Sequence, residues 1–209
     1  MAEILRKKID EHSVYAIWHI TESVEELEPA ICLREGEAEL YETFVAESRK
    51  KQWLAYRILV RRLLSPDDFP VEYDPCGKPY LAGSDYHISV THSDDLAAVI
   101  ISRGKAGIDL EKIRPRVAKV KDRFMSEKEL SAVGTERELE QMTLTWCAKE
   151  ALYKFYGQRT LDFREQIHVE IPPRAGMPFS AGIFFEGKHS RYRLQSEIIR
   201  DFVMVYLLE

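Results

Sequence analysis

Short apolar runs predict the strands of this chain. Val14–Ile20 (VYAIWHI) is one such run, and His87–Ser93 and Leu96–Ser102 are two more, separated by two aspartates. Two β-rich runs joined by a short polar turn are typical of a hairpin. Ala106–Glu111 (AGIDLE) predicts a further strand, and beyond Ile167 the stretches HVEI, FSAGIFFEG, YRLQSEI and FVMVYLL predict a run of strands that ends the chain.

Helix formers dominate the stretches between these runs. Glu37–Leu64 reads as one helix or two, ended by Ser65 and Pro66. Ser126 and Glu129 have the spacing of a capping box and predict a short helix, followed by a longer one over Glu136–Tyr156. Each half of the chain thus offers a long helix and about three strands.

The predicted fold class is α/β (α+β), built from two similar, pseudo-symmetric halves. Each half is expected to pack its long helix on a small, mainly antiparallel sheet. We place the boundary so that residues 1–103 form the N-terminal half and residues 104–209 the C-terminal half, with an active site at their junction.

Composition limits the function classes. With 209 residues and 45% hydrophobic content, the chain has enough apolar material for a packed core. Lys and Arg number 30 against 35 Asp and Glu, a net charge of −5, which argues against a general nucleic-acid-binding protein. Any anion site must therefore be local.

The cysteines and the N-terminal segment indicate a reducing compartment. Cys32, Cys76 and Cys147 are an odd number at wide spacing, without a zinc-binding pattern. The first residues lack the basic head and apolar core of a signal peptide, and the longest apolar run, Leu96–Ile101, is too short to span a bilayer. We expect a cytoplasmic protein that is not in a membrane.

Two carboxylates stand close together in the motif GIDLE. Since side chains alternate along a strand, Asp109 and Glu111 project from the same face. Like charges at that spacing repel unless a cation lies between them. The simpler alternative is a strand that ends in solvent, and the pair alone does not exclude it.

The motif WCAKEALYK, Trp146 to Lys154, places ionisable groups on a helix. Glu150 and Lys154 are four residues apart, which also suits an ordinary exposed ion pair on an amphipathic helix. A hard divalent cation such as Mg²⁺ prefers carboxylate oxygens and retains room for substrate phosphate. Asp109, Glu111 and Glu150 together would make such a metal site.

The stretch from Lys112 to Arg123 is strongly basic. It holds six Lys or Arg residues against the single acidic Asp122, and we interpret it as a loop. Its charge predicts either a docking surface for an acidic partner or a solvated segment that pairs with the protein's own acids.

The ordered motifs resemble those of the Sfp-type phosphopantetheinyl transferases, the holo-acyl-carrier-protein synthase superfamily. The resemblance runs from the helix around Arg49 to about Tyr156. The motifs that carry it are GKP (Gly77–Pro79), the strand end Thr91-His92-Ser93, GIDLE (Gly107–Glu111), Phe-x-Ser-x-x-Glu (Phe124–Glu129) and WxxKExxxK (Trp146–Lys154).

The resemblance implies a function and roles for single residues. Such enzymes transfer the phosphopantetheine arm of coenzyme A to a serine of an acyl or peptidyl carrier protein, with Mg²⁺, and release adenosine 3',5'-bisphosphate. Asp109 and Glu111 would be metal ligands, and Glu150 a third ligand, the base that takes the serine proton, or both. The residues implied to contact the coenzyme or its phosphates are Lys154, Lys149, Lys78, His92 and Thr91, together with Arg49, Lys51 or Arg57 of the first long helix at the 3'-phosphate.

The implied partners are coenzyme A and an acidic acyl or peptidyl carrier protein, and a monomer would suffice because the chain supplies both halves. Two other functions fit the same residues. One is a different Mg²⁺-dependent nucleotide or pyrophosphate hydrolase, in which water replaces the serine. The other is a non-catalytic module that binds coenzyme A or a carrier domain.

Overall fold

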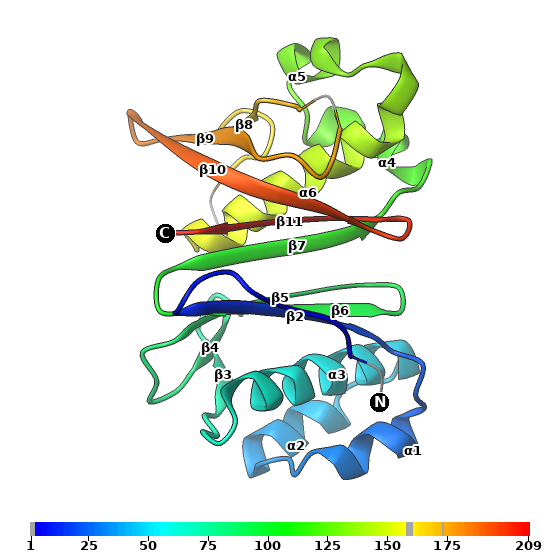
Figure 1. The fold of residues 1–209 in the computed structure, drawn as a ribbon, viewed down its shortest axis with the longest axis vertical. Helices are drawn as coiled ribbons and strands as arrows, with labels where there is room; N and C mark the ends of the chain where they lie inside the picture. Colours follow the sequence, from blue (N-terminus) through cyan, green and yellow to red (C-terminus); the bar gives the residue numbers. More distant parts are fainter. Residues whose placement is uncertain (1–2, 158–160, 173) are drawn as a thin grey trace. The chain divides into compact units, whose positions relative to one another are not determined.

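The structure is a computed structural model that describes residues 3–157, 161–172 and 174–209. These residues form two compact units (Figure 1). Unit 1 comprises the described residues up to Asp74 together with Pro79–Arg103, and unit 2 comprises Pro75–Lys78 and Gly104–Glu209. Both units combine helices with antiparallel strands, so the expected mixed α/β fold is confirmed. A pseudo-symmetric relation between them stays a prediction.

Unit 1 is built on a four-stranded antiparallel sheet of order β1-β2-β6-β5. The hairpin predicted over residues 87–102 is confirmed, because β5 and β6 pair with His87 opposite Ser102 and Ser93 opposite Leu96. Ala16, Trp18 and Val99 lie in the core cluster that the sheet shares with the long helix α3 (Glu47–Leu64). The strands are β1 (Glu3–Lys8), β2 (Ser13–His19), β5 (His87–Ser93) and β6 (Leu96–Ser102).

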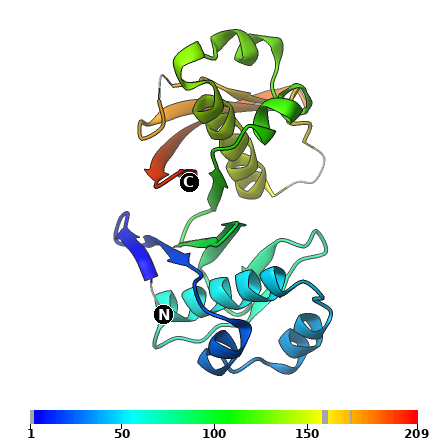
Figure 2. The same ribbon diagram turned by 90° about the vertical axis from the view of Figure 1, so that its right-hand side faces the viewer.

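The helices of unit 1 lie on one side of this sheet (Figure 2). The stretch predicted as one helix or two forms two, because the chain leaves the helical path between Thr43 and Ala46. A small β3-β4 hairpin that the sequence pattern did not predict completes the unit. These elements are α1 (Val24–Leu27), η1 (Glu28–Ala30), α2 (Glu35–Glu42), α3 (Glu47–Leu64), β3 (Val71–Tyr73) and β4 (Pro79–Leu81).

Unit 2 contains a five-stranded antiparallel sheet of order β7-β11-β10-β9-β8. The predicted strand AGIDLE is its first strand, and it pairs with the last strand of the chain, so that Asp109 lies opposite Val205. The strands are β7 (Ala106–Lys112), β8 (Ile167–Val169), β9 (Phe179–Phe185), β10 (Lys188–Ile199) and β11 (Phe202–Leu208).

The long helix of unit 2 packs on this sheet. Leu144, Ala148 and Ala151 of α6 share a core cluster with Val203 and Val205 of β11. The predicted capping box is confirmed, since Ser126 and Glu129 bond reciprocally at the start of α5. The helical elements are α4 (Arg116–Val120), η2 (Lys121–Arg123), α5 (Glu127–Ala132), η3 (Thr135–Arg137) and α6 (Glu138–Tyr156).

The prediction of a loop from Lys112 to Arg123 is wrong, because most of this stretch is helical, as α4 and η2. Val117, Ala118 and Val120 pack against the cluster formed by Phe124, Met125 and Met142. The apolar positions between the basic residues thus give this stretch an amphipathic character, and its buried side stabilises the short helix.

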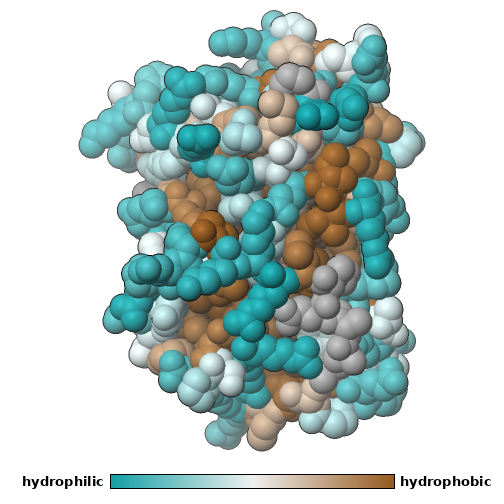
Figure 3. Space-filling view, in the orientation of Figure 1, coloured by the Kyte–Doolittle hydropathy of each residue, from teal (hydrophilic) through white to brown (hydrophobic). Residues whose placement is uncertain are grey.

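Polar residues cover much of the face seen in the space-filling view (Figure 3). None of the helices in the described part of the chain has both the length and the apolar composition that crossing a membrane requires. The large apolar side chains found exposed are Val45, Tyr73, Tyr80, Met177, Phe184 and Ile198.

Candidate active site

A glycine sets the close approach of β7 to α6. A Cβ atom on Gly107 would lie 2.1 Å from the carbonyl oxygen of Ala151 and 2.9 Å from Cβ of Phe155, distances that no side chain can occupy. The strand therefore contacts the helix backbone directly. Because side chains two apart on a strand share a face, Asp109 follows Gly107 on the side that faces α6.

Asp109 meets a lysine of the helix. Nζ of Lys154 donates a hydrogen bond of 2.6 Å to Oδ1 of Asp109 and another of 3.1 Å to the carbonyl oxygen of Ile108. The Asp109 side chain is only 6% exposed and that of Lys154 is 26% exposed. Lys154 thus bonds across to β7, which sets it apart from the ordinary exposed helix pair that the spacing also allowed.

The charges of Asp109 and Lys154 act on the carboxyl group of Glu150. The pKa of the Glu150 carboxyl is raised to about 7, mainly by burial and also by the negative charges of Asp109 and Glu111, while Lys154 acts in the opposite direction. Burial and the same two carboxylates hold the pKa of the buried Cys147 thiol well above its usual value. The carboxylates of β7 and α6 therefore share one electrostatic environment.

These carboxylates fit a hard divalent cation by their chemistry, though the described residues contain no group of three His, Cys, Asp or Glu side chains arranged to hold a metal ion. Burial, together with the charges of Asp109 and Glu111, is why Glu150 binds a proton so readily in the metal-free protein. A cation would replace that proton and draw the oxygens of Asp109, Glu111 and Glu150 together.

Lys78 packs with unit 2, although the sequence placed it in the N-terminal half. Its Nζ atom lies 3.4 Å from the point that a Cβ on Gly157 would occupy. Gly157 ends α6 in a left-handed conformation with φ of 75° and donates its N–H to the carbonyl oxygen of Tyr153. Lys78 therefore lies at the helix end that carries Lys154, where a positive charge is electrostatically favourable.

Unit 1 brings together two of the residues predicted to contact the coenzyme. Nη1 of Arg49 on α3 donates a hydrogen bond of 2.6 Å to Nε2 of His92 on β5. Since a guanidinium group has only donors, Nε2 of His92 is the acceptor. The neighbouring Thr91 is buried and, one residue away on the strand, faces the opposite side of the sheet.

The other two basic residues of α3 differ in their surroundings. Arg57 is only 2% exposed. It donates to Oε1 of Glu37 at 2.7 Å and stacks 3.9 Å above the Trp53 ring. Its charge is thus used inside unit 1, whereas the resemblance implied a contact with the coenzyme. Lys51 forms a partly exposed ion pair of 3.0 Å with Glu47.

Lys149, which the resemblance implied to face the phosphates of the coenzyme, is bonded within unit 2 instead. Its side chain is fully buried, and Nζ donates to Oε2 of Glu129 at 2.8 Å and to the carbonyl oxygens of Phe163 and Ile167, both at 2.7 Å. An ammonium group has three N–H donors, and all three are used. Burial lowers the pKa of Lys149, and Glu129 opposes that effect. The sequence feature that could have indicated its burial is the position of this lysine among the apolar residues that follow Trp146.

Comparison with known proteins supports the same family as the motifs. A family model described as the 4'-phosphopantetheinyl transferase superfamily matches residues 105–207, which span the sheet and the long helix of unit 2. The chain belongs to the 4'-phosphopantetheinyl transferase superfamily. Within this family, a protein of Salmonella typhi named 4'-phosphopantetheinyl transferase AcpT is 36% identical over 116 residues, 52% of this chain and 60% of that protein.

Two further members of the superfamily show similar coverage. The 4'-phosphopantetheinyl transferase AcpT of Escherichia coli (strain K12) is 34% identical over 117 residues, which are 52% of this chain and 59% of that protein. The 4'-phosphopantetheinyl transferase psf-1 of Bacillus pumilus is 26% identical over 145 residues, 65% of this chain and 61% of that protein. The chain thus matches about three fifths of the length of these curated relatives.

Proposed function

We propose that this protein transfers the phosphopantetheine arm of coenzyme A to a serine of an acidic acyl or peptidyl carrier protein, with Mg²⁺, in the cytoplasm. The serine Oγ attacks the phosphorus that carries the pantetheine arm. A new O–P bond forms, the bond between this phosphorus and the bridging oxygen of the diphosphate breaks, and adenosine 3',5'-bisphosphate leaves. The serine proton passes to a carboxylate or to solvent.

The observation that carries this proposal is the convergence of Glu150 and Lys154 of α6 with Asp109 of β7. Displacement at a diphosphate needs alignment and neutralisation of charge more than covalent help from the protein. Lys154 supplies a cation beside the carboxylates. Glu150 supplies a carboxyl whose pKa of about 7 lets it hold or release a proton near neutral pH.

Asp109, Glu111 and Glu150 are the residues that we propose hold Mg²⁺. Bound there, the ion would neutralise charge on the diphosphate and on the leaving group. Glu150 is proposed as a third ligand, as the base, or as both. Both roles need the ionised carboxylate, so the raised pKa of the metal-free protein is expected to fall when a cation binds.

The coenzyme is proposed to meet Lys78 at the end of α6 and the Arg49–His92 pair of unit 1. Of the basic residues of α3, Arg49 is favoured at the 3'-phosphate over Lys51, because its guanidinium group already bonds to His92, a second residue implied in coenzyme binding. That both groups and Thr91 contact a single coenzyme molecule stays a prediction, as does the monomeric state.

The test is a transfer assay read by mass spectrometry. The parent protein and the Asp109→Asn variant are each incubated with coenzyme A, Mg²⁺ and an apo carrier protein. The mass of the carrier is then measured after each reaction. We expect the parent alone to add the phosphopantetheine mass. Cleavage of coenzyme A with an unmodified carrier would instead indicate a hydrolase, and binding without either product a non-catalytic module.

A further inference from the structure

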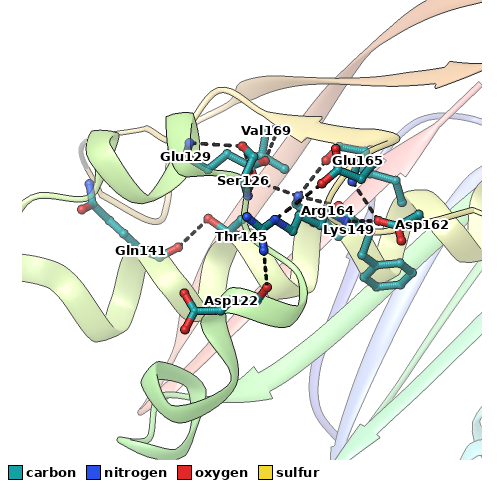
Figure 4. A network of polar contacts seen from close by, with 12 residues as sticks. Asp122, Ser126, Glu129, Gln141, Thr145, Lys149, Asp162, Arg164, Glu165 and Val169 are labelled. Carbon is teal, nitrogen blue, oxygen red and sulfur yellow. Dashed lines mark hydrogen bonds and ion pairs between the residues drawn. The ribbon is translucent and has the colours of Figure 1, made fainter.

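The buried ion pair between Lys149 and Glu129 joins three parts of unit 2 to the helix that carries Glu150. Figure 4 shows Lys149 projecting from α6 into this network. Its Nζ atom donates to Glu129 of α5 and to two backbone carbonyl oxygens, that of Phe163 in the segment before β8 and that of Ile167, the first residue of β8. With Lys149 at 0% and Glu129 at 4% side-chain exposure, both charges are removed from solvent.

The carboxylate of Glu129 accepts further hydrogen bonds besides that from Lys149. Its Oε2 atom also accepts from the backbone N–H of Ser126 at 2.8 Å and from the Ser126 hydroxyl at 3.1 Å. Its Oε1 atom accepts from the backbone N–H of Val169 in β8 at 2.8 Å. One carboxylate therefore fixes the start of α5, the strand β8 and, through Lys149, the helix α6.

The segment that Lys149 bonds is also packed against α6 through the side chain of Phe163. The Phe163 ring lies 5.7 Å from the Trp146 ring and 5.3 Å from the Tyr153 ring, measured between centroids. Asp162 orders the same turn, because its Oδ1 atom accepts from the backbone N–H groups of Arg164 and Glu165. The contacts of Lys149 and of Phe163 thus hold one segment against one side of the helix.

Helix geometry links this side to the proposed active site. Successive residues on an α-helix are turned by about 100°, so Lys149 and Glu150 leave α6 in different directions. Lys154, four residues after Glu150, shares its direction and reaches Asp109. A rotation of α6 that released Lys149 from its acceptors would also turn Glu150 and Lys154 away from β7.

We infer that Lys149 is a positioning residue: with Glu129 and two backbone carbonyls it fixes the rotation of α6 that directs Glu150 and Lys154 toward the carboxylates of β7. The inference rests on the proposed function for its kinetic test. It assigns no contact with substrate to Lys149.

The test separates positioning from stability with a paired substitution. Lys149→Met leaves the Glu129 charge buried without its cation and is expected to unfold or weaken the protein. The double variant Lys149→Met with Glu129→Gln removes both charges, keeps the side-chain volumes, and is expected to recover most of the lost melting temperature. Lys128→Met, an exposed neighbour in α5, is the matched control for loss of a lysine.

Transfer kinetics of the folded variants then decide the question, measured after the parent has been shown to transfer. We expect kcat of the double variant to fall by about tenfold or more, with KM for coenzyme A within about twofold of the parent, because the reacting groups are misplaced while the coenzyme contacts persist. A double variant with recovered melting temperature and parental kcat would overturn the inference. A parent protein without transfer would instead contradict the proposed function.

Two further measurements do not depend on the double variant folding. Glu129→Gln retains the shape but offers an amide N–H₂ in place of one acceptor oxygen, so it must lose either the bonds at Oε2 or that at Oε1. We expect a several-fold lower kcat at unchanged KM.

Hydrogen exchange in the parent protein requires neither a variant nor activity. The Val169 amide should exchange as slowly as the amides in the core of α6. Exchange at the rate of an exposed loop would show that the network does not hold this segment.

Discussion

The ammonium group of Lys154 lies 2.6 Å from Oδ1 of Asp109, and this bond joins the end of α6 to the middle of β7. The two residues are far apart in the sequence, and the close approach at Gly107 is what allows them to meet. The charges of both Asp109 and Lys154 act on the Glu150 carboxyl, so this ion pair affects the protonation of Glu150 as well as the packing of α6 on β7. Lys154 balances part of the carboxylate charge, and it remains partly exposed to a ligand.

Substitution of Lys154 by methionine is expected to lower kcat for transfer by about a hundredfold or more, because a cation beside a reacting diphosphate would be lost. Loss of the cation beside the buried Asp109 is also expected to lower the melting temperature, but the untouched helix core around Ala148 and Leu152 should keep the variant folded. Steady-state assays and circular dichroism on Lys154→Met check both points, with Lys188→Met at the exposed start of β10 as control. Parental kcat in folded Lys154→Met would remove Lys154 from the reaction.

The raised pKa of Glu150 predicts how stability depends on pH. The carboxyl has a pKa of about 7 in the folded protein against 4.5 as the reference value for the unfolded chain, so the folded state binds this proton more tightly. The resulting stabilisation is complete below pH 4.5 and is lost as the pH rises through 7. Above that range the ionised Glu150 destabilises the metal-free fold.

Glu150→Gln should therefore gain stability over the parent at alkaline pH, by at most about 3 kcal/mol, and little at acid pH. Mg²⁺ should raise the melting temperature of the parent above neutral pH, where the carboxylates are ionised, and affect the variant less. Denaturant unfolding at about pH 5 and pH 8, with and without Mg²⁺, checks both statements. A stability difference independent of pH would show that Glu150 titrates normally.

Local patterns predicted the parts of the site that lie within single elements. The strand of GIDLE, the helix of WCAKEALYK, the hairpin at residues 87–102 and the capping box at Ser126 depend on spacing within short windows, and the structure has all of them. Burial was not predictable in the same way. A lysine or arginine on a helix reads as exposed unless its partner is known.

Lys149 and Arg57 illustrate this limit. Each is a fully buried cation whose carboxylate partner, Glu129 or Glu37, lies twenty residues earlier in the chain on another helix. No helical period links residues on separate elements, so their partners could not be predicted, and the family resemblance implied a contact with the coenzyme instead. The basic stretch before Phe124 was predicted as a loop for a related reason. Its apolar residues pack against α6 and the Phe124 cluster, which the local sequence does not reveal.

The contact between Arg49 and His92 predicts which cation recognises the 3'-phosphate. Arg49→Gln should weaken coenzyme A binding by about tenfold and leave dephospho-coenzyme A nearly unaffected, because only the former carries the phosphate that pairs with the guanidinium group. Lys51→Gln, two residues further along α3 and paired with Glu47, is the matched control and should change neither affinity. Calorimetry of both variants with both ligands shows whether Arg49 or Lys51 binds the 3'-phosphate.

If both ligands lose affinity equally in Arg49→Gln, the residue acts by supporting His92. A loss confined to Lys51→Gln would assign the 3'-phosphate to Lys51 instead of Arg49. Either result would leave the proposed metal site of unit 2 unaffected, since its carboxylates belong to other elements.

The basic surface of α4 and η2 predicts where the acidic carrier protein binds. Arg114, Arg116, Lys119 and Arg123 are exposed, while the apolar side of α4 is packed. The stretch directly follows β7, whose Asp109 and Glu111 are the proposed metal ligands. Because the chain as a whole carries a net charge of −5, attraction of an acidic partner must come from a local group of this kind.

Reversing Arg116 and Lys119 to glutamate should raise KM for the carrier by about tenfold, mainly through slower association, and reduce its dependence on salt. Coenzyme A affinity and kcat at saturating carrier should stay close to the parental values, since neither residue is implied in coenzyme binding. The matched control reverses Arg174 and Lys188, two exposed basic residues of the same unit, so that the net charge changes equally. Equal effects of the two reversals would mean that only total charge matters, and parental salt dependence in the α4 variant would place the carrier elsewhere, with the α3 helix as the next surface to test.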